Sequence, residues 1–131
     1  MIEVENIHKS FGDNHVLKGI STVFEKGKTN LIIGQSGSGK TVFIKCLLGL
    51  FEPDEGQICY NGQYYSKLST KERRNLRQEM GMVFQGSALF DSMTVEGNVM
   101  FPLDMFTNQS QSEKQDRVDF VLKRVNLIDA H

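Results

Sequence analysis

The chain has 131 residues, 39% of them hydrophobic and 24% charged, which fits one soluble globular domain with a modest core. Its formal net charge is −1, from 15 Lys and Arg against 16 Asp and Glu residues, so it lacks the basic excess of nucleic-acid binders and no nucleic-acid partner is expected. Its apolar runs are too short to cross a bilayer and its charged N-terminus lacks a signal-peptide core, so we expect a cytoplasmic protein or one face of a membrane complex.

The first part of the chain combines strand signals with one helical segment. Residues 1–9 and 16–24 are predicted strands, separated by turn chemistry at 11–14. The short, continuous apolar run 29–33 is typical of a strand buried on both faces of a parallel sheet. A glycine-rich bend comes next, and the apolar spacing after it predicts a helix over 41–50.

A hairpin and a short basic helix are predicted next. Asn61-Gly62 is a strong two-residue turn signal inside the segment 57–65, so these residues should form a β-hairpin. Ser69 and Glu72 have the spacing of a capping box, which should open a helix. The basic residues of 71–77 are expected to lie on a solvated face of that helix.

The rest of the chain predicts one more strand and two helices. Residues 81–84 form a short apolar run that predicts a strand, and helices are expected over 94–106 and 112–127. Cys46 and Cys59 are not spaced as a metal or redox pair, so two buried, reduced thiols are expected. The whole pattern predicts an α/β fold with a small antiparallel β layer attached.

The glycine bend, residues 34–41, reads GQSGSGKT and fits the phosphate-binding pattern G-x-x-x-x-G-K-[ST]. Its glycines let the backbone curl close to a ligand, and its N–H groups with the start of the following helix attract an anion. Lys40 can reach the β and γ phosphates of a nucleotide, and the Thr41 hydroxyl can ligate Mg²⁺. A glycine-rich turn without a ligand is the alternative, but the flanking strand and helix patterns disfavour it. The predicted contacts are Gly34, Gln35, Ser36, Gly37, Ser38, Gly39, Lys40 and Thr41.

Around the glycine bend, the chain resembles the ATP-binding subunits of ATP-binding cassette (ABC) transporters over all 131 residues. The stretches KSFGDNHVLKGIS (9–21), LFEPDEGQICYNG (50–62) and MGMVFQ (80–85) stand in the family's order around the phosphate-binding motif. The resemblance implies a P-loop NTPase fold of the ABC-ATPase type, with ATP and Mg²⁺ as cofactors.

The resemblance also implies roles for single residues. Phe11 would stack on adenine with Val16 beside the base, although an ordinary core aromatic is the alternative for Phe11. Gln85 would be the glutamine of the family's Q-loop, in contact with Mg²⁺ and water, and a surface amide is its alternative. Lys40 and Gln85 are therefore the expected catalytic residues, and Thr41 and Gln85 the expected metal ligands.

One segment resembles a particular subgroup. FQGSALFDSMTVEGNVMFPL (84–103) is similar to the Mla/Mce-type phospholipid transport ATPases, which work at the cytoplasmic face of the inner membrane. In that subgroup a transmembrane permease subunit docks after Gln85, where Leu89, Phe90 and Val95 are candidate contacts unless they are core residues. The alternatives are an ATPase of another ABC importer, for amino acids or metal chelates, and a nucleotide-binding module that never hydrolyses ATP.

Several groups that the family uses for hydrolysis are not found. There is no SGG tripeptide of the signature segment, Asp54-Glu55 does not follow an apolar strand, and Asp129 and His131 stand at the chain end. We therefore expect the N-terminal portion of the domain with its C-terminal half absent, inactive alone, whereas the full-length ATPase would hydrolyse ATP as a homodimer.

The expected parts of this portion are an antiparallel β part over 1–28, a P-loop core to the Q-loop over 29–85, and a truncated helical part over 86–131. In the family fold, further strands lie between the strand before the glycine bend and the strand before Gln85. Unpaired strand edges and apolar faces favour pairing with another chain, so the fragment is expected to self-associate.

Overall fold

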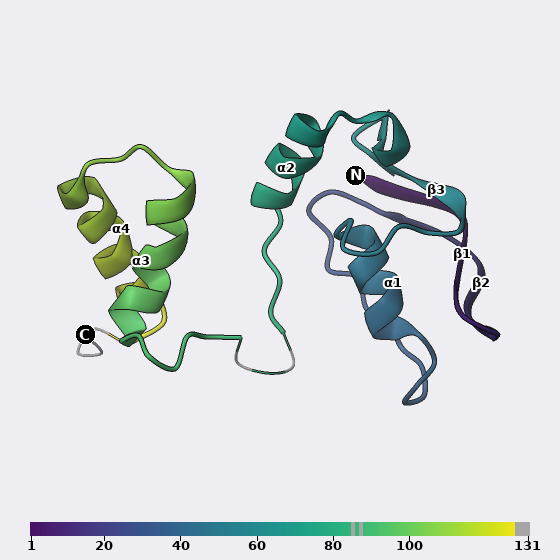
Figure 1. Ribbon diagram of the computed structural model, residues 1–131, viewed down its shortest axis with the longest axis horizontal. Helices are drawn as coiled ribbons and strands as arrows, with labels where there is room; N and C mark the ends of the chain where they lie inside the picture. Colours follow the sequence, from purple (N-terminus) through teal and green to yellow (C-terminus); the bar gives the residue numbers. More distant parts are fainter. Residues whose placement is uncertain (85, 87, 128–131) are drawn as a thin grey trace. The chain divides into compact units, whose positions relative to one another are not determined.

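A computed structural model describes residues 1–84, 86 and 88–127. The chain divides into two compact units, Met1–Met82 and Val83–His131, which are described separately (Figure 1). None of the described helices has the length and apolar character needed to span a membrane. The elements are β1 (Ile2–Phe11), β2 (Asn14–Phe24), α1 (Lys40–Leu47), β3 (Glu55–Tyr60), β4 (Gln63–Tyr64), the 3₁₀ turn η1 (Tyr65–Lys67), α2 (Thr70–Gln78), α3 (Val95–Phe106) and α4 (Gln111–Arg124).

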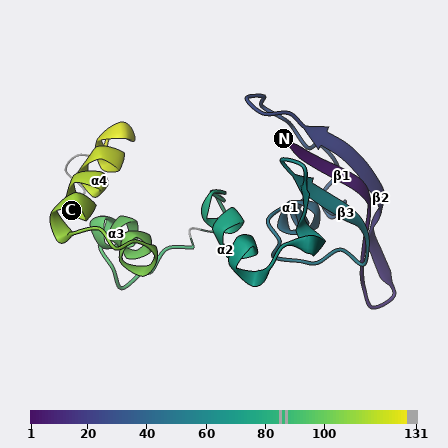
Figure 2. The ribbon, with the colours of Figure 1, turned by 90° about the horizontal axis from the view of Figure 1, so that it is seen from above.

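The first unit is built on an antiparallel sheet with strand order β2-β1-β3-β4. Helix α1 packs beside this sheet, as Figures 1 and 2 show from two directions. Two residues of α1, Phe43 and Cys46, are buried in the same cluster as side chains from β1, β2 and β3. Cys46 and Cys59 are both buried, as predicted. The buried cluster consists of Val4, Ile7, Leu17, Phe43, Cys46, Ile58, Tyr60 and Tyr65.

A bulge in β1 brings two residues that are three positions apart, Val4 and Ile7, into this core. In a regular strand, Val4 and Ile7 would point to opposite faces, yet both are buried. The register shifts between them, and Asn6 has a left-handed φ of 49°. Gly56 of β3, with φ 89°, lies against the bulge, where a β-carbon would collide with the carbonyl oxygens of Glu5 and Asn6. Only glycine therefore fits β3 at this point.

The two predicted parallel strands are wrong for this structure. Residues 29–33 and 81–84 have irregular backbone. Leu31, Ile33 and Val83 are 85%, 81% and 97% exposed. A strand forms when a neighbour accepts and donates its ladder hydrogen bonds. Among the described residues, no strand pairs with either segment, so Leu31, Ile33 and Val83 are left in solvent, whereas Ile32 packs against the core cluster.

The predicted turn and cap signals are confirmed. Asn61 and Gly62, with φ values of 49° and 85°, connect β3 to β4 as a two-residue hairpin turn. Ser69 Oγ accepts from the backbone N–H of Glu72, whose carboxylate accepts from the backbone N–H of Ser69 at 2.7 Å. Local sequence chemistry therefore determined where these elements begin and turn.

The second unit contains the helices α3 and α4. Met100 of α3 packs with Val118 and Leu122 of α4, and Val118 and Leu122 have the helical spacing expected from the sequence. Each helix begins at a side-chain cap, Thr94 for α3 and Ser110 for α4. Three buried side chains make a small core, so more of the apolar surface stays exposed in this unit than in a unit with a larger core.

Gly56→Ala should destabilise the first unit more than Gly62→Ala. Both glycines have a left-handed backbone, which costs a residue with a β-carbon about 1–2 kcal/mol. Open space surrounds Gly62, whereas the new methyl group at Gly56 collides with backbone oxygens. We expect losses in the free energy of unfolding of about 1–2 kcal/mol for Gly62→Ala and about 3 kcal/mol or more for Gly56→Ala, measured by urea unfolding. Equal losses would contradict the close approach at Gly56.

Candidate functional site

The N-terminus of α1 is open to an anion. Helix α1 begins at Lys40 after Gly39, which makes no side-chain cap, and its first turn contains no acidic residue. The N–H of Phe43 donates to the Gly39 carbonyl at 2.8 Å, so the N–H groups before Phe43 precede the helix's own hydrogen-bond ladder. These N–H groups and the positive end of the helix dipole attract negative charge. The other three described α-helices are capped by Ser69, Thr94 and Ser110.

Gly39 holds the glycine bend tightly against β2. A β-carbon built on Gly39 would lie 2.9 Å from Val16 Cγ1 and 3.1 Å from Leu17 Cδ2, and its φ is 93°. Any other residue would therefore strain the backbone and push α1 away from β2. As a consequence Val16, the residue predicted to lie beside the base, touches the bend.

The remainder of the glycine bend folds back on itself. The N–H of Ser38 donates to the Gln35 carbonyl at 3.2 Å. A β-carbon on Gly34 would lie 2.6 Å from Ser38 Oγ, so a side chain here would require the Ser38 hydroxyl to move. Gly37 has φ 79° and open space on its β-carbon side. The bend is thus curled at Gly34 and open at Gly37, as a loop that surrounds a small anion requires.

The Lys40 ammonium lies over the glycine bend. It donates to the carbonyls of Gly34 and Gln35, at 2.7 Å in both cases. No carboxylate takes part in these contacts, so the positive charge is held by backbone dipoles next to the open helix N-terminus. A phosphate could accept the same hydrogen bonds in a charge-assisted and hence stronger form. Thr41 follows in the first helical turn and is exposed.

Phe11 lies at the end of the strand that pairs with β2. It is the last residue of β1 and stands opposite Asn14, and it is 45% exposed. From Asn14, β2 reaches Val16 in two residues, or about 7 Å at the usual rise per residue. The predicted base platform and the predicted phosphate loop are therefore positioned by one strand, β2.

The turn after α1 contacts this end of β1, which sequence reasoning missed. The ring centroids of Phe51 and Phe11 are 5.5 Å apart, with an interplanar angle of 68°. Asp54 accepts from Lys9 Nζ at 2.6 Å and from the N–H of Ser10 at 2.6 Å. No periodicity marks residues 51–54 in the sequence, so only the folded chain reveals these contacts. The hydrogen bond from Lys9, aided by that from Ser10, holds the pKa of Asp54 below its usual value.

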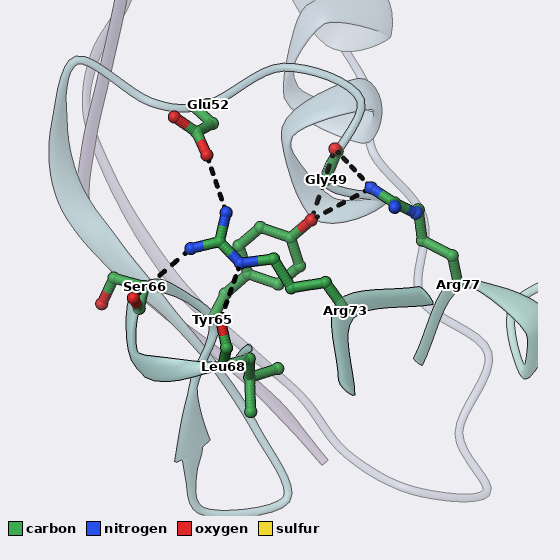
Figure 3. Close-up of polar contacts among 7 residues, drawn as sticks. All are labelled: Gly49, Glu52, Tyr65, Ser66, Leu68, Arg73 and Arg77. Atoms are coloured by element: carbon green, nitrogen blue, oxygen red, sulfur yellow. Dashed lines mark hydrogen bonds and ion pairs between the residues drawn. The ribbon is translucent and has the colours of Figure 1, made fainter. Parts of the chain in front are cut away.

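The other end of α1 is closed by hydrogen bonds, as Figure 3 shows. The Tyr65 hydroxyl donates to the Gly49 carbonyl at 3.4 Å, and Arg77 Nη1 donates to the same oxygen at 3.5 Å. Arg73 pairs with Glu52 at 2.9 Å, and its guanidinium carbon lies 4.7 Å from the Tyr65 ring centroid. The prediction of a solvated basic face is confirmed for Lys71, Arg74 and Arg77, which are exposed, and is wrong for Arg73, which is half-buried and reaches back to the turn after α1.

The structure does not bring all the predicted residues together. Gln85 lies outside the described residues, as do Asp129 and His131. Within the described ranges, no three His, Cys, Asp or Glu side chains are grouped to hold a metal. A polar cavity of about 220 Å³ lies elsewhere in the first unit. Its lining residues are Tyr60, Asn61, Gln63, Leu68, Glu72, Asn75, Leu76 and Glu79.

The predicted docking residues lie in the second unit. Leu89, Phe90 and Val95 are exposed. The Asn98 side chain fixes the loop that carries Phe90, because its Oδ1 accepts from the Phe90 N–H at 2.8 Å and its Nδ2 donates to the Thr94 carbonyl at 2.9 Å. The alternative that all three residues are core is therefore wrong for the described chain.

Known proteins resemble this chain over nearly its whole length. A family model described as ABC transporter matches residues 17–131. The L-cystine import ATP-binding protein TcyN of Bacillus subtilis is 43% identical over 131 residues, covering 98% of this chain and 51% of that protein. The chloroplastic protein TRIGALACTOSYLDIACYLGLYCEROL 3 of Arabidopsis thaliana is 38% identical over 128 residues, covering 97% of this chain and 36% of that protein.

A solved structure resembles the fold as well. The dimeric post-hydrolysis state of the ATP-binding cassette MJ0796, bound to ADP and Pi, matches with a TM-score of 0.83 at 27% identity. The match covers 96% of this chain and 57% of that chain. Across these three proteins the chain thus spans between 36% and 57% of the relative's length.

Asp54 should make the stability of the first unit sensitive to acid. Its pKa is lowered in the folded state, so its contacts stabilise the fold above the unfolded pKa, and this stabilisation is lost as the pH falls through the folded pKa. Asp54→Asn should therefore reduce the loss of urea stability below about pH 4. Glu72, whose pKa is lowered by hydrogen bonds from Ser69, accounts for part of the remaining pH dependence of the first unit. An unchanged pH profile would contradict the role assigned to Asp54.

Proposed function

The chain belongs to the ABC transporter family of ATP-binding proteins, and on that premise we propose that it is the ATP-binding half of an ATPase that powers transport across a cell envelope. The α/β fold of the ABC-ATPase type predicted from the sequence is confirmed by the structural likeness. Because the chain spans only part of its relatives' lengths, ATP hydrolysis, cargo and partners belong to the proposal.

One observation carries the proposal: the uncapped N-terminus of α1 beside the Lys40 ammonium. In the other described α-helices a serine or threonine oxygen accepts from the first N–H groups. At α1 a glycine replaces that cap, so the N–H groups can donate to a ligand instead. A polyphosphate supplies several acceptor oxygens with negative charge, which suits both the N–H groups and Lys40.

We assign the following roles within this site. The glycine bend and Lys40 bind the phosphates of ATP, and Thr41 ligates Mg²⁺. Phe11 stacks on adenine through the exposed part of its ring, with Val16 beside the base. Bound Mg²⁺ would neutralise phosphate charge, which is the chemistry a metal supplies to phosphoryl transfer.

The family resemblance supports further roles and partners. Gln85 contacts Mg²⁺ and water in this proposal, although it lies outside the described residues. A permease subunit docks on the second unit through Leu89, Phe90 and Val95, whose exposure makes them accessible. The full-length ATPase works as a homodimer on the cytoplasmic face of the inner membrane, and this chain alone binds ATP without efficient hydrolysis.

The proposed cargo is phospholipid, because residues 84–103 resemble the Mla/Mce-type ATPases. A relative named for a galactolipid, at 38% identity, is compatible with a lipid cargo. An amino acid is the second candidate, because TcyN, at 43% identity, is named for L-cystine import. Co-purification of the full-length ATPase with its permease, followed by analysis of bound lipid and amino acid, distinguishes the two.

Lys40→Ala should weaken MgATP binding by about 100-fold, since it removes a charged donor from the phosphates. Isothermal titration calorimetry of the chain with MgATP measures the affinity. Lys71→Ala is the matched control because it removes an exposed lysine from α2, away from the glycine bend, and it should leave the affinity unchanged. Equal affinities for Lys40→Ala and the unmodified chain would refute the proposed site.

The exposed apolar segments predict self-association. Leu31 and Ile33 are largely exposed, and contact with another copy would remove them from water. Light scattering should give a mass above that of one chain, and the double variant Leu31→Lys with Ile33→Lys should lower it. Val125→Lys, at an exposed apolar residue of the second unit, should leave the mass unchanged. A monomeric unmodified chain would contradict the prediction.

A further inference from the structure

We propose that Phe51 is a positioning residue for the nucleobase, because its ring holds Phe11 in the orientation in which Phe11 stacks on the base. The inference rests on the proposed function, since it needs Phe11 as the base platform. Phe51 does not contact the nucleotide in this account and acts through Phe11.

The first observation is the contact between the two rings. Their centroids are 5.5 Å apart and their planes make an angle of 68°, an edge-to-face arrangement that aromatic rings prefer over a stacked one. Phe11 is 45% exposed at the end of β1, where an aromatic side chain without a packed neighbour would change rotamer readily. The Phe51 edge contact therefore restricts Phe11 and leaves part of its ring open to a ligand.

The second observation is that Phe51 is itself fixed by α1. The N–H groups of Leu50 and Phe51 both donate to the Lys45 carbonyl, at 2.9 and 3.2 Å. Phe51 also packs against the buried core cluster of the first unit. Its ring is therefore anchored to the helix that begins at the glycine bend, so Phe11 is oriented relative to that helix.

The third observation is that the same turn is tied to β1. The N–H of Asp54 donates to the His8 carbonyl at 2.9 Å. The Asp54 carboxylate accepts from Lys9 and from the backbone of Ser10, the residue before Phe11. The turn therefore connects the C-terminal end of α1 to the end of β1, next to Phe11.

Two lysines complete the cluster. Lys9 Nζ lies 5.6 Å from the Phe11 ring centroid, and Lys45 Nζ lies 5.2 Å from the Phe51 ring centroid. Ammonium groups at these distances are attracted to the negative faces of the rings. Asp54 holds the Lys9 ammonium in turn, so the position of each ring is supported by a cation as well as by the other ring.

A positioning role and a purely structural role predict different losses. If Phe51 orients Phe11, its removal weakens binding of ligands that contain a base and spares ligands that contain only phosphates. If Phe51 only supports α1, the glycine bend is disturbed and both kinds of ligand lose affinity. Comparison of MgATP with Mg²⁺-tripolyphosphate separates the two roles.

The experiment is calorimetric titration of the whole chain with both ligands. Phe51→Ala should weaken MgATP binding about threefold to tenfold, the range that one aromatic pair accounts for, and leave tripolyphosphate binding within about twofold. Phe51→Tyr keeps the ring and should restore MgATP affinity. Tyr64→Ala is the matched control, since it removes a ring that is also in contact with a lysine ammonium, that of Lys67. It should change neither affinity.

Two results would overturn the proposal: equal losses for both ligands in Phe51→Ala, or no loss for MgATP in Phe51→Ala. Phe11→Ala and Lys40→Ala distinguish this failure from failure of the proposed function. If Phe11→Ala weakens MgATP binding selectively while Phe51→Ala does not, only the role of Phe51 is wrong. If neither Phe11→Ala nor Lys40→Ala weakens MgATP binding, the proposed site itself is wrong, and the role of Phe51 with it.

Discussion

The close approach of Gly39 to β2 is the contact on which the rest of the site depends. At this point the backbone is left-handed, and a β-carbon would meet Val16 and Leu17. The contact places the open N-terminus of α1 on the strand whose neighbour ends at Phe11. Without it, the glycine bend would remain a flexible loop, and a phosphate site would have no fixed relation to a base platform. A single glycine thereby joins the two halves of the candidate site.

Helix α1 connects the glycine bend to the turn that contacts β1, and its two ends have different hydrogen bonding. At its N-terminus a glycine replaces the side-chain cap and the N–H groups are open to an anion. At its C-terminus Tyr65 and Arg77 donate to the Gly49 carbonyl (Figure 3). The following turn reaches β1 through Asp54. The hydrogen bonds at the C-terminus hold α1 in place. The free N–H groups at its N-terminus therefore have a fixed position for a charged ligand.

The sequence predicted those features that depend on adjacent residues. The capping box at Ser69, the Asn61-Gly62 turn and the two strands β1 and β2 were all found where expected. Contacts between distant residues, such as Phe51 with Phe11 or Arg73 with Glu52, have no local pattern and could not be predicted. The strands predicted for 29–33 and 81–84 were wrong because an apolar run indicates that a segment can be buried, but not what will pair with it.

Everything proposed for this chain requires that it binds the phosphates of a nucleotide at the start of α1. Backbone amide chemical shifts, recorded by NMR during titration with MgATP, test it most directly because they locate the ligand residue by residue. We expect the largest shifts at Gly37, Gly39, Lys40 and Thr41, with smaller shifts at Phe11 and Val16. Shifts confined to other residues, such as Asn61 and Asn75 beside the polar cavity, would contradict it.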